Sequence, residues 1–519
     1  MPAAKTLMIQ GTASHAGKTL LVAGLARIMA QDGFSVAPFK SQNMSLNSFV
    51  SAEGGEMGRA QVVQAEAARV KPHTDMNPVL LKPTTDTGAQ VVVQGKPVAT
   101  MTAQDYHDYK MGLMDAVYDS LDRLRRDFQV VLIEGAGSPA EVNFRGRDIA
   151  NMVVAEMAEA PVLLVGDIER GGVFAQLVGT MELLQDSDRQ RVAGFIINKF
   201  RGDRTILEPG LDFLESHCQR PVLGVVPYVK DLRVEEEDSV GLPQRSSEPP
   251  GPGQGARALF PSDVRGGGDR AARHGDPVRV RILRLPRLSN FTDFDALSDC
   301  PGFECGYVEH AAGLRGADLI IIPGTKSTVA DLRFLWSSGI AAEVIRRAQG
   351  GTPVIGICGG FQMLGKKVLD RRGLDGGAGS VKGLGLLDVE TVFEPEKETR
   401  QQSGRITGYN ALLPRGTAVS GYEIHMGQTY LGPQAAHLLG TRSGPDGAVS
   451  ENGLVLGTYM HGFFDSNEVL AGLLSWFGMP AELPLIDRAA AKEHEYDRLA
   501  VALRNSVDIE KIYEIAGLA

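Results

Sequence analysis

Short apolar runs alternate with stretches of helical spacing up to about residue 230. The runs are bounded by Gly, Pro or polar residues, as is typical of strands buried on both faces of a parallel sheet. They lie at residues 6–10, 35–39, 130–133, 161–165, 192–197 and 221–226. This regular alternation of strands and helices predicts an α/β fold built on a doubly wound parallel sheet.

The composition changes after residue 235, where Pro and Gly become frequent. Residues 249–255 and 265–269 cannot bury a core, so we expect a flexible linker here. New strand patterns then begin at residue 278 and indicate a second α/β domain, and apolar spacing near the C-terminal end indicates a helical brace. The predicted segments are residues 1–235, a linker over 236–277, a domain over 278–470 and a helical tail over 471–519.

The length of 519 residues agrees with two or three domains. A formal charge of −10 argues against a nucleic-acid partner, because phosphate binding favours a basic face. The four cysteines include no C-x-x-C pair, which argues against a disulfide framework or a zinc site. No apolar run reaches membrane-spanning length, and the first residues lead directly into a strand. We therefore expect a cytoplasmic protein without a membrane partner, and leave open whether it forms a homo-oligomer.

The first strand runs into the glycine-rich loop Gly11-Thr12-Ala13-Ser14-His15-Ala16-Gly17-Lys18-Thr19, and a helix follows. In this order of elements, backbone N–H groups hold phosphates, Lys18 neutralises the terminal ones and the Thr19 hydroxyl reaches Mg²⁺. ATP with Mg²⁺ is therefore the predicted cofactor pair, and Gly11, Thr12 and Gly17 are further nucleotide contacts. The loop is one residue longer than the common P-loop and resembles that of the dethiobiotin-synthetase-like branch.

Two polar residues follow other strands of this sheet. Glu134 ends the run at 130–133, where a carboxylate can bind the Mg²⁺ opposite Thr19; a strand-end acid without a ligand is the alternative. Asn198 ends the run at 192–197 and resembles the base-reading residue of related nucleotide-binding proteins. A simple polar strand end explains Asn198 equally well.

Loops beyond the carboxyl ends of parallel strands face the ligand crevice, which makes their polar residues substrate candidates. The first group of candidates lies at residues 40–43, after the run at 35–39, and the second lies in the charged loop that follows Glu134. A solvated loop and a surface ion-pair network are the alternatives for the two groups. The candidates are Lys40, Gln42, Asn43, Arg145 and Asp148.

In the second domain, residues 353–365 read as a buried strand, a sharp turn and a helix, with Cys358 at the turn. The surrounding G-x-C-x-G pattern is the cysteine counterpart of a nucleophile elbow, in which a strained turn exposes the nucleophile. The next backbone N–H, that of Gly359, is then free to hold an oxyanion, and Gly324 is the candidate for a second donor. A buried structural cysteine is the alternative.

A catalytic cysteine needs a base from elsewhere in the chain. His461 follows a short apolar strand and precedes a Gly turn, so it is the predicted base. His425 is the competitor, and together with Glu423 it has the alternative role of holding substrate or bracing the domain.

The elbow together with His461 resembles a class I glutamine amidotransferase. That family carries Glu two residues after the His, whereas this chain has Phe463, as in the subgroup that amidates cobyrinic and cobyric acids. The whole chain outside the Pro/Gly linker resembles the cobyric acid synthase family. The motifs that carry this resemblance are residues 11–19, 39–45, 134–139, 323–328, 421–427 and 459–462.

The resemblance implies a glutamine- and ATP-dependent ligase with a P-loop domain and a C-terminal α/β glutamine amidotransferase domain. Its implied substrate is adenosylcobyrinic acid a,c-diamide, amidated at the b, d, e and g carboxylates through acyl phosphates and ammonia released at Cys358. The corrinoid, glutamine and ATP are the implied small-molecule partners. Free ammonia protonates quickly in water, so we expect the two domains to pack closely.

Three alternatives remain at this point. The first is the sister amidotransferase that makes the a,c-diamide itself; the block at residues 40–45 resembles cobyric acid synthase better, and product analysis distinguishes the two. A nucleotide-switch protein with an inactive glutaminase domain would not depend on Cys358. A carboxylase of the dethiobiotin type would share only the first domain.

Overall fold

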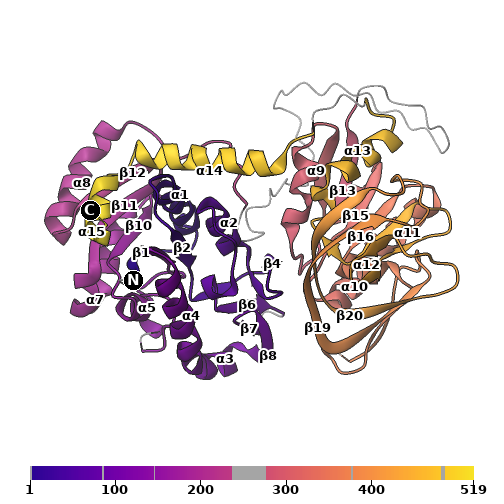
Figure 1. The fold of residues 1–519 in the computed structure, drawn as a ribbon, viewed down its shortest axis with the longest axis horizontal. Coiled ribbons are helices and arrows are strands. Elements are labelled where there is room, and N and C mark those ends of the chain that lie inside the picture. Colours follow the sequence, from indigo (N-terminus) through magenta and orange to yellow (C-terminus); the bar gives the residue numbers. More distant parts are fainter. Residues whose placement is uncertain are drawn as a thin grey trace.

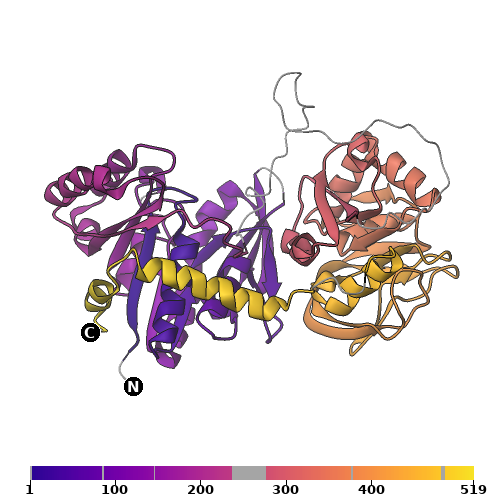
Figure 2. The same ribbon diagram turned by 90° about the horizontal axis from the view of Figure 1, so that it is seen from above.

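A computed structural model describes residues 3–84, 87–144, 146–235, 276–375, 378–480 and 485–518. Two α/β lobes lie side by side, with the first at the left of Figure 1 and the second at the right. The long helix α14 (Arg488–Arg504) leads from the second lobe back along the first, which the view from above in Figure 2 also shows. The predicted α/β class is confirmed for both parts of the chain.

Six parallel strands form the central sheet of the first lobe, in the order β12-β11-β10-β1-β9-β2. Successive side chains of a strand point to opposite faces, so Leu7 and Ile9 join one buried cluster and Met8 another. Burial on both faces explains the continuous apolar runs of the sequence. The strands are β1 (Lys5–Gly11), β2 (Val36–Phe39), β9 (Val130–Glu134), β10 (Val162–Asp167), β11 (Val192–Phe200) and β12 (Val222–Pro227).

Helices cover the two faces of this sheet. They are α1 (Lys18–Gln31), α2 (Arg59–Ala67), α4 (Met114–Asp127), α5 (Met152–Met157), α6 (Val173–Leu183), α7 (Asp186–Arg191) and α8 (Arg204–Cys218). Helix α1 begins immediately after the glycine-rich loop, and the carboxyl ends of β1 and β9 lie next to its start because the two strands pair in parallel register. The central sheet thus places the loop and Glu134 at the same edge.

A smaller set of strands extends the first lobe toward the second. Strands β3 (Gln42–Met44), β6 (Val79–Pro83), β7 (Gly88–Val93) and β8 (Lys96–Thr102) form one sheet, followed by helix α3 (Ala103–Tyr109). Strands β4 (Ser48–Val50) and β5 (Glu56–Gly58) form an antiparallel pair. This extension carries the chain from the nucleotide loop to the boundary between the lobes.

The second lobe contains two sheets. The first has the order β14-β13-β15-β16-β24-β23 and is parallel except for its last pair. Its strands are β13 (Val278–Leu283), β14 (Phe303–Val308), β15 (Leu319–Ile322), β16 (Val354–Ile357), β23 (Ala448–Val449) and β24 (Val455–Thr458). Its helices are α9 (Asp295–Asp299), α10 (Thr328–Ser337), α11 (Ile340–Gln349) and α12 (Gly359–Leu364).

The other sheet of this lobe is mainly antiparallel and is built around two long strands, β19 (Val389–Ile406) and β20 (Ala418–Leu431). It brings β25 (Met460–His461) to the edge of β20 and so fixes the position of His461. The remaining strands are β17 (Lys367–Asp370), β18 (Gly379–Lys382), β21 (Leu439–Thr441) and β22 (Gly444–Asp446).

The C-terminal helices divide between the lobes. Helix α13 (Asn467–Trp476) contributes Leu473 to the core of the second lobe, whereas α14 and α15 (Ile509–Ala516) pack on the first. Gly24 of α1 permits this packing, because a Cβ there would overlap the Leu503 side chain. The buried Arg27 guanidinium binds two carboxylates of α14. The tail therefore fastens the second lobe to the first.

None of the helices in the described ranges combines the length and the apolarity that crossing a membrane requires.

Candidate active sites

Cys358 occupies the sharp turn between β16 and α12. Its backbone φ of 51° lies in the left-handed region, which is strained for a residue with a side chain. The flanking glycines are required by close contacts: a Cβ on Gly356 would lie 2.8 Å from the Gly360 backbone, and one on Gly360 would collide with the Ile322 carbonyl oxygen. The predicted elbow is therefore present, and its thiol is buried with the Ile424 carbonyl oxygen at 3.5 Å from Sγ.

His461 is the histidine that the structure associates with this thiol. Its Nδ1 lies 2.6 Å from Oδ2 of Asp293, and both side chains are almost fully buried. Burial opposes the charged imidazolium, but the charge of Asp293, the charge of Cys358 and hydrogen bonds to both raise the pKa of His461 to about 10. A histidine beside the sulfur is the partner that a nucleophilic cysteine needs.

Asp293 was not identified from the sequence. It lies in the short helix η5 (Phe291–Phe294), and its Oδ1 also accepts a hydrogen bond from the Gly462 backbone N–H at 3.0 Å. Asp293 thus occupies the third position of a Cys-His-acid triad, while Phe463, where a class I enzyme carries Glu, is buried in the core. Asp293 and His461 are 168 residues apart, so the sequence does not show that they form a pair. The available signal was an acid shortly after the carboxyl end of a parallel strand.

His425, the competing base, has a different environment. Its Nδ1 faces the Gly427 carbonyl oxygen at 2.8 Å, and its ring stacks on Tyr459 at 3.6 Å. Burial, only partly offset by that hydrogen bond, lowers the pKa of His425 to about 3, so its ring is neutral. Glu423 binds the Arg400 guanidinium. His425 still borders the cavity at Cys358. The acid that orients an imidazole at this centre, Asp293, contacts His461.

Both glycines predicted as oxyanion donors lie at this centre. A Cβ on Gly324 would lie 3.1 Å from Cε1 of His461, and one on Gly359 would lie 3.2 Å from the Thr325 backbone nitrogen. The loop after β15 therefore runs directly alongside the elbow. Backbone N–H groups from two segments, the elbow at Gly359 and the loop at Gly324, would lie near an oxyanion that forms at Cys358.

The nucleotide loop has the geometry of a phosphate cradle. Gly17 has a φ of 94°, which the close turn into α1 requires, and Lys18 Nζ donates to the Ala13 and Gly137 carbonyl oxygens at 3.1 Å each. Asn198 Nδ2 donates to the Ala16 carbonyl oxygen at 2.9 Å, which places this residue against the loop. The Thr12 backbone N–H donates to Val165. Lys18 is thus held over the loop by carbonyl groups that a bound phosphate can replace.

The Thr19 hydroxyl donates to Glu134 Oε1 at 2.9 Å, so the two residues predicted to hold the metal lie next to each other. Lys40 binds the same carboxylate oxygen at 3.0 Å, and Gln64 Nε2 donates to the other at 2.6 Å. Oε1 of Gln64 is buried without a hydrogen-bond partner in the described part of the chain. That part also contains no group of three His, Cys, Asp or Glu side chains suited to a metal. Glu134 and Thr19 nevertheless fit Mg²⁺, which in such sites keeps water and phosphate ligands.

The substrate candidates have diverse surroundings. Lys40 lies at Glu134, but Gln42 accepts a hydrogen bond from the Tyr106 hydroxyl and Asn43 donates one to Gln61. Asp148 accepts hydrogen bonds from the backbone N–H groups of residues 150 and 151 and so shapes its own loop. Arg145 lies outside the described residues. Among the described members of this group, Lys40 is the one in contact with the predicted metal site.

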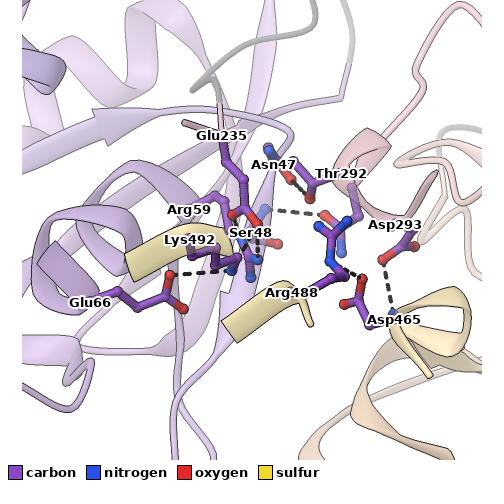
Figure 3. A network of polar contacts seen from close by, with 12 residues as sticks. Asn47, Ser48, Arg59, Glu66, Glu235, Thr292, Asp293, Asp465, Arg488 and Lys492 are labelled. Carbon is purple, nitrogen blue, oxygen red and sulfur yellow. Dashed lines mark hydrogen bonds and ion pairs between the residues drawn. The ribbon is translucent and has the colours of Figure 1, made fainter. Parts of the chain in front are cut away.

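The two lobes meet at His461. Ser48 of β4 donates its backbone N–H to Asn290 Oδ1 at 3.1 Å, and Thr292 donates its hydroxyl to Asn47 Oδ1 at 3.3 Å, one residue before Asp293 (Figure 3). The Tyr422 hydroxyl donates to the Ser48 carbonyl oxygen at 3.0 Å, while its ring stacks on His461. The close packing expected from the sequence is confirmed at this contact.

A charged network continues along the same boundary (Figure 3). Arg59 of α2 binds Glu235, which also accepts from Lys492 of α14 at 2.9 Å. Arg488, at the start of α14, binds Asp465 at 3.2 Å, close to the turn that carries His461. Helix α14 thereby connects the first lobe with the centre at Cys358 and His461.

Comparison with known proteins agrees with this division. Residues 7–240 match the model of a CobQ/CobB/MinD/ParA nucleotide binding domain, and residues 279–469 match a CobB/CobQ-like glutamine amidotransferase domain. Over 99% of its length the chain is 46% identical to a cobyric acid synthase of Dehalococcoides mccartyi, covering 98% of that protein.

The chain belongs to the cobyric acid synthase family. Cobyric acid synthases of Pelotomaculum thermopropionicum and Sorangium cellulosum are 47% and 48% identical to it, each over 99% of this chain and over 97% and 99% of their own lengths. The resemblance noted in the sequence is confirmed. With a nucleotide binding domain, a glutamine amidotransferase domain and cobyric acid synthase relatives, the chain is a glutamine-dependent, ATP-using amidating ligase.

Proposed function

We propose that the protein amidates the b, d, e and g carboxylates of adenosylcobyrinic acid a,c-diamide, with ammonia from glutamine and activation by ATP. The single observation that supports this most strongly is the triad of Cys358, His461 and Asp293 in a chain that matches cobyric acid synthases over nearly its full length. We assign the ligase half to residues 1–235, the linker to 236–277, the glutaminase half to 278–470 and the helical tail to 471–519.

The glutaminase half begins with the Cys358 thiolate attacking the side-chain amide carbon of glutamine. The oxyanion that forms is held by the Gly359 N–H, with the loop at Gly324 as the second source of donors. The His461 imidazolium gives its proton to the departing nitrogen, so that ammonia leaves and a thioester remains. His461 then accepts a proton from the water that releases glutamate. Asp293 keeps the imidazole oriented and stabilises its charged form throughout.

Ammonia does not form an amide directly with a carboxylate, so the ligase half first activates the substrate carboxylate. A substrate carboxylate oxygen attacks the γ-phosphorus of ATP, giving an acyl phosphate and ADP, and ammonia then displaces phosphate to form the amide. Lys18 and the backbone of the loop at Gly11, Thr12 and Gly17 hold the phosphates, and Asn198 supports the loop.

Thr19 and Glu134 would hold Mg²⁺, which, when bound, offsets negative charge on the transferred phosphoryl group. Lys40 stands at the same carboxylate and is placed to meet the anionic substrate or its phosphate. Gln42, Asn43, Arg145 and Asp148 stay candidates for corrinoid contacts. Four peripheral carboxylates are served by one site, so we infer that the corrinoid is released and rebound in successive orientations.

Product analysis tests this proposal. The purified protein is incubated with adenosylcobyrinic acid a,c-diamide, ATP, Mg²⁺ and glutamine, beside Cys358→Ala with either glutamine or ammonium chloride. We expect successive amidations by the wild type, none by the variant with glutamine, and recovery with ammonia. Turnover of cobyrinic acid instead would indicate the sister enzyme that makes the a,c-diamide, and an unaffected variant would indicate an inactive glutaminase domain.

A further inference from the structure

A group of lysines borders the cavity at Cys358, and the mechanism above uses none of them. Lys82 comes from β6 of the first lobe, Lys397 from β19 and Lys326 from the loop after β15. The same cavity is bordered by His461 and Asp375. Since three lysine side chains border a cavity whose nucleophile acts on glutamine, a ligand that carries a negative charge is expected there.

Two of these lysines share one carboxylate. Glu56 of β5, which is fully buried, accepts a hydrogen bond from Lys82 Nζ at 2.6 Å and another from Lys397 Nζ. Lys82 also donates to the Ser48 hydroxyl at 2.8 Å. One carboxylate thus faces two lysines, and burial lowers the pKa of Lys397, so a further negative charge would stabilise the charged form of this cluster.

Lys326 differs from both neighbours. Its backbone N–H donates to the Arg287 carbonyl oxygen, but across the described ranges its ammonium forms no hydrogen bond or ion pair. Burial, followed by the charges of Lys397 and Lys82, lowers the pKa of Lys326 to about 7, while Glu56 and Asp375 act in the opposite direction. An anion beside Lys326 would therefore stabilise its charged form.

The Lys326 backbone lies next to the elbow, and its side chain borders the cavity at Cys358. Lys326 follows Thr325, whose backbone nitrogen would lie 3.2 Å from a Cβ on Gly359. In glutamine four carbon–carbon bonds separate the reacting amide carbon from the α-carboxylate carbon, a span of roughly 4–5 Å at ordinary bond lengths. A long side chain that starts beside the elbow can reach a carboxylate at that distance.

We propose that Lys326, with Lys82 and Lys397 behind it, binds the α-carboxylate of glutamine, so that the first lobe completes the glutamine site through Lys82 and Glu56. This inference rests on the proposed glutaminase function. It also gives a physical reason for the close contact between the lobes at this point, because the cation cluster forms only when β5 and β6 meet β19.

The test compares two substrates that differ by this one group. Glutamine and 4-aminobutanamide, which lacks the α-carboxylate, are hydrolysed by the wild type, Lys326→Met, Lys326→Arg and the control Lys367→Met, whose side chain lies on β17 away from the cavity. In Lys326→Met we expect kcat/KM for glutamine to fall about 10- to 100-fold, mostly through KM, because a charged hydrogen bond is lost. The value for 4-aminobutanamide should stay within about twofold. Lys326→Arg should restore most of the preference, and Lys367→Met should behave as wild type.

An equal loss for both substrates, or no loss for either, would overturn the inference. If Lys326→Met does not fold, Lys326→Gln provides the same comparison. Ammonia-dependent amidation, measured on the same preparations, separates this result from the proposed function. A wild type that hydrolyses no glutamine contradicts the proposed glutaminase, whereas an active wild type with unchanged discrimination in the variants contradicts only the role of Lys326.

Discussion

Replacing Asp293 by Asn removes the charge next to His461 and keeps the shape of the side chain. The two carboxylate oxygens of Asp293 accept hydrogen bonds from His461 Nδ1 at 2.6 Å and from the Gly462 N–H at 3.0 Å. Asn offers one acceptor oxygen, so one of these two donors would face an NH₂ group. Both effects destabilise the imidazolium that accompanies the thiolate.

The expected loss follows from burial. A hydrogen bond to a charged group contributes about 1.5–3 kcal/mol, and this pair is almost completely shielded from water. A loss of about 3 kcal/mol corresponds to roughly 100-fold in glutaminase kcat/KM. The pKa of His461, about 10 in the native centre, should fall, so the alkaline limb of the pH profile should move to lower pH.

The assay measures glutamate release between pH 6 and 11, beside ammonia-dependent amidation on the same preparation. Ammonia-dependent amidation should be unchanged, because Asp293 acts only on the thiol centre. A raised histidine pKa also contributes to folding stability, in full below the unfolded value of about 6.5 and progressively less toward pH 10. The difference in Tm between wild type and variant should therefore shrink over that window. A variant with the wild-type rate and pH profile would refute the assignment of Asp293 to the triad.

Three further predictions concern the lobe contact, the ligase site and the elbow. Thr292→Val removes the hydrogen bond to Asn47 of the first lobe, one residue before Asp293, and should lower glutaminase kcat about 3- to 10-fold with little change in KM. Thr292→Ser should restore kcat. Equal activity of the two variants would contradict a role of this lobe contact in the glutaminase reaction. Glu134→Gln should abolish ATP-dependent amidation with either nitrogen source while glutamine hydrolysis persists, measured by ADP and glutamate release; retained amidation would exclude Glu134 as a metal ligand. Gly360→Ala should disrupt the elbow, because the added Cβ would collide with the Ile322 carbonyl oxygen. A variant with the wild-type Tm and full thiol reactivity would contradict this close contact between Gly360 and Ile322.

The sequence predicted those parts of the protein that are contiguous in the chain. The nucleotide loop and the elbow each lie within about ten residues, and their glycines carry the geometric requirement directly. The central sheet was predictable because burial on both faces leaves uninterrupted apolar runs. By contrast, the long strands β19 and β20 carry charged and exposed positions, which give no clear period in the sequence.

Features that depend on distant contacts were not predictable. Asp293 meets His461 across 168 residues, and no spacing rule relates them. Lys82 reaches the cavity at Cys358 only because the small strands of the first lobe are placed against the second. The packing of α14 on the first lobe depends on Gly24 and the buried Arg27. The sequence around these two residues does not indicate that they contact α14.

Isotope transfer tests the central claim most directly. The protein is given adenosylcobyrinic acid a,c-diamide, ATP, Mg²⁺ and glutamine labelled with ¹⁵N at its side-chain amide, in the presence of unlabelled ammonium ions. Mass spectrometry of the corrinoid should then show up to four ¹⁵N amides, because ammonia released at Cys358 reaches the acyl phosphate without mixing with solvent. A product that carries only unlabelled nitrogen, or no amidated corrinoid from a preparation that hydrolyses glutamine, would contradict the account.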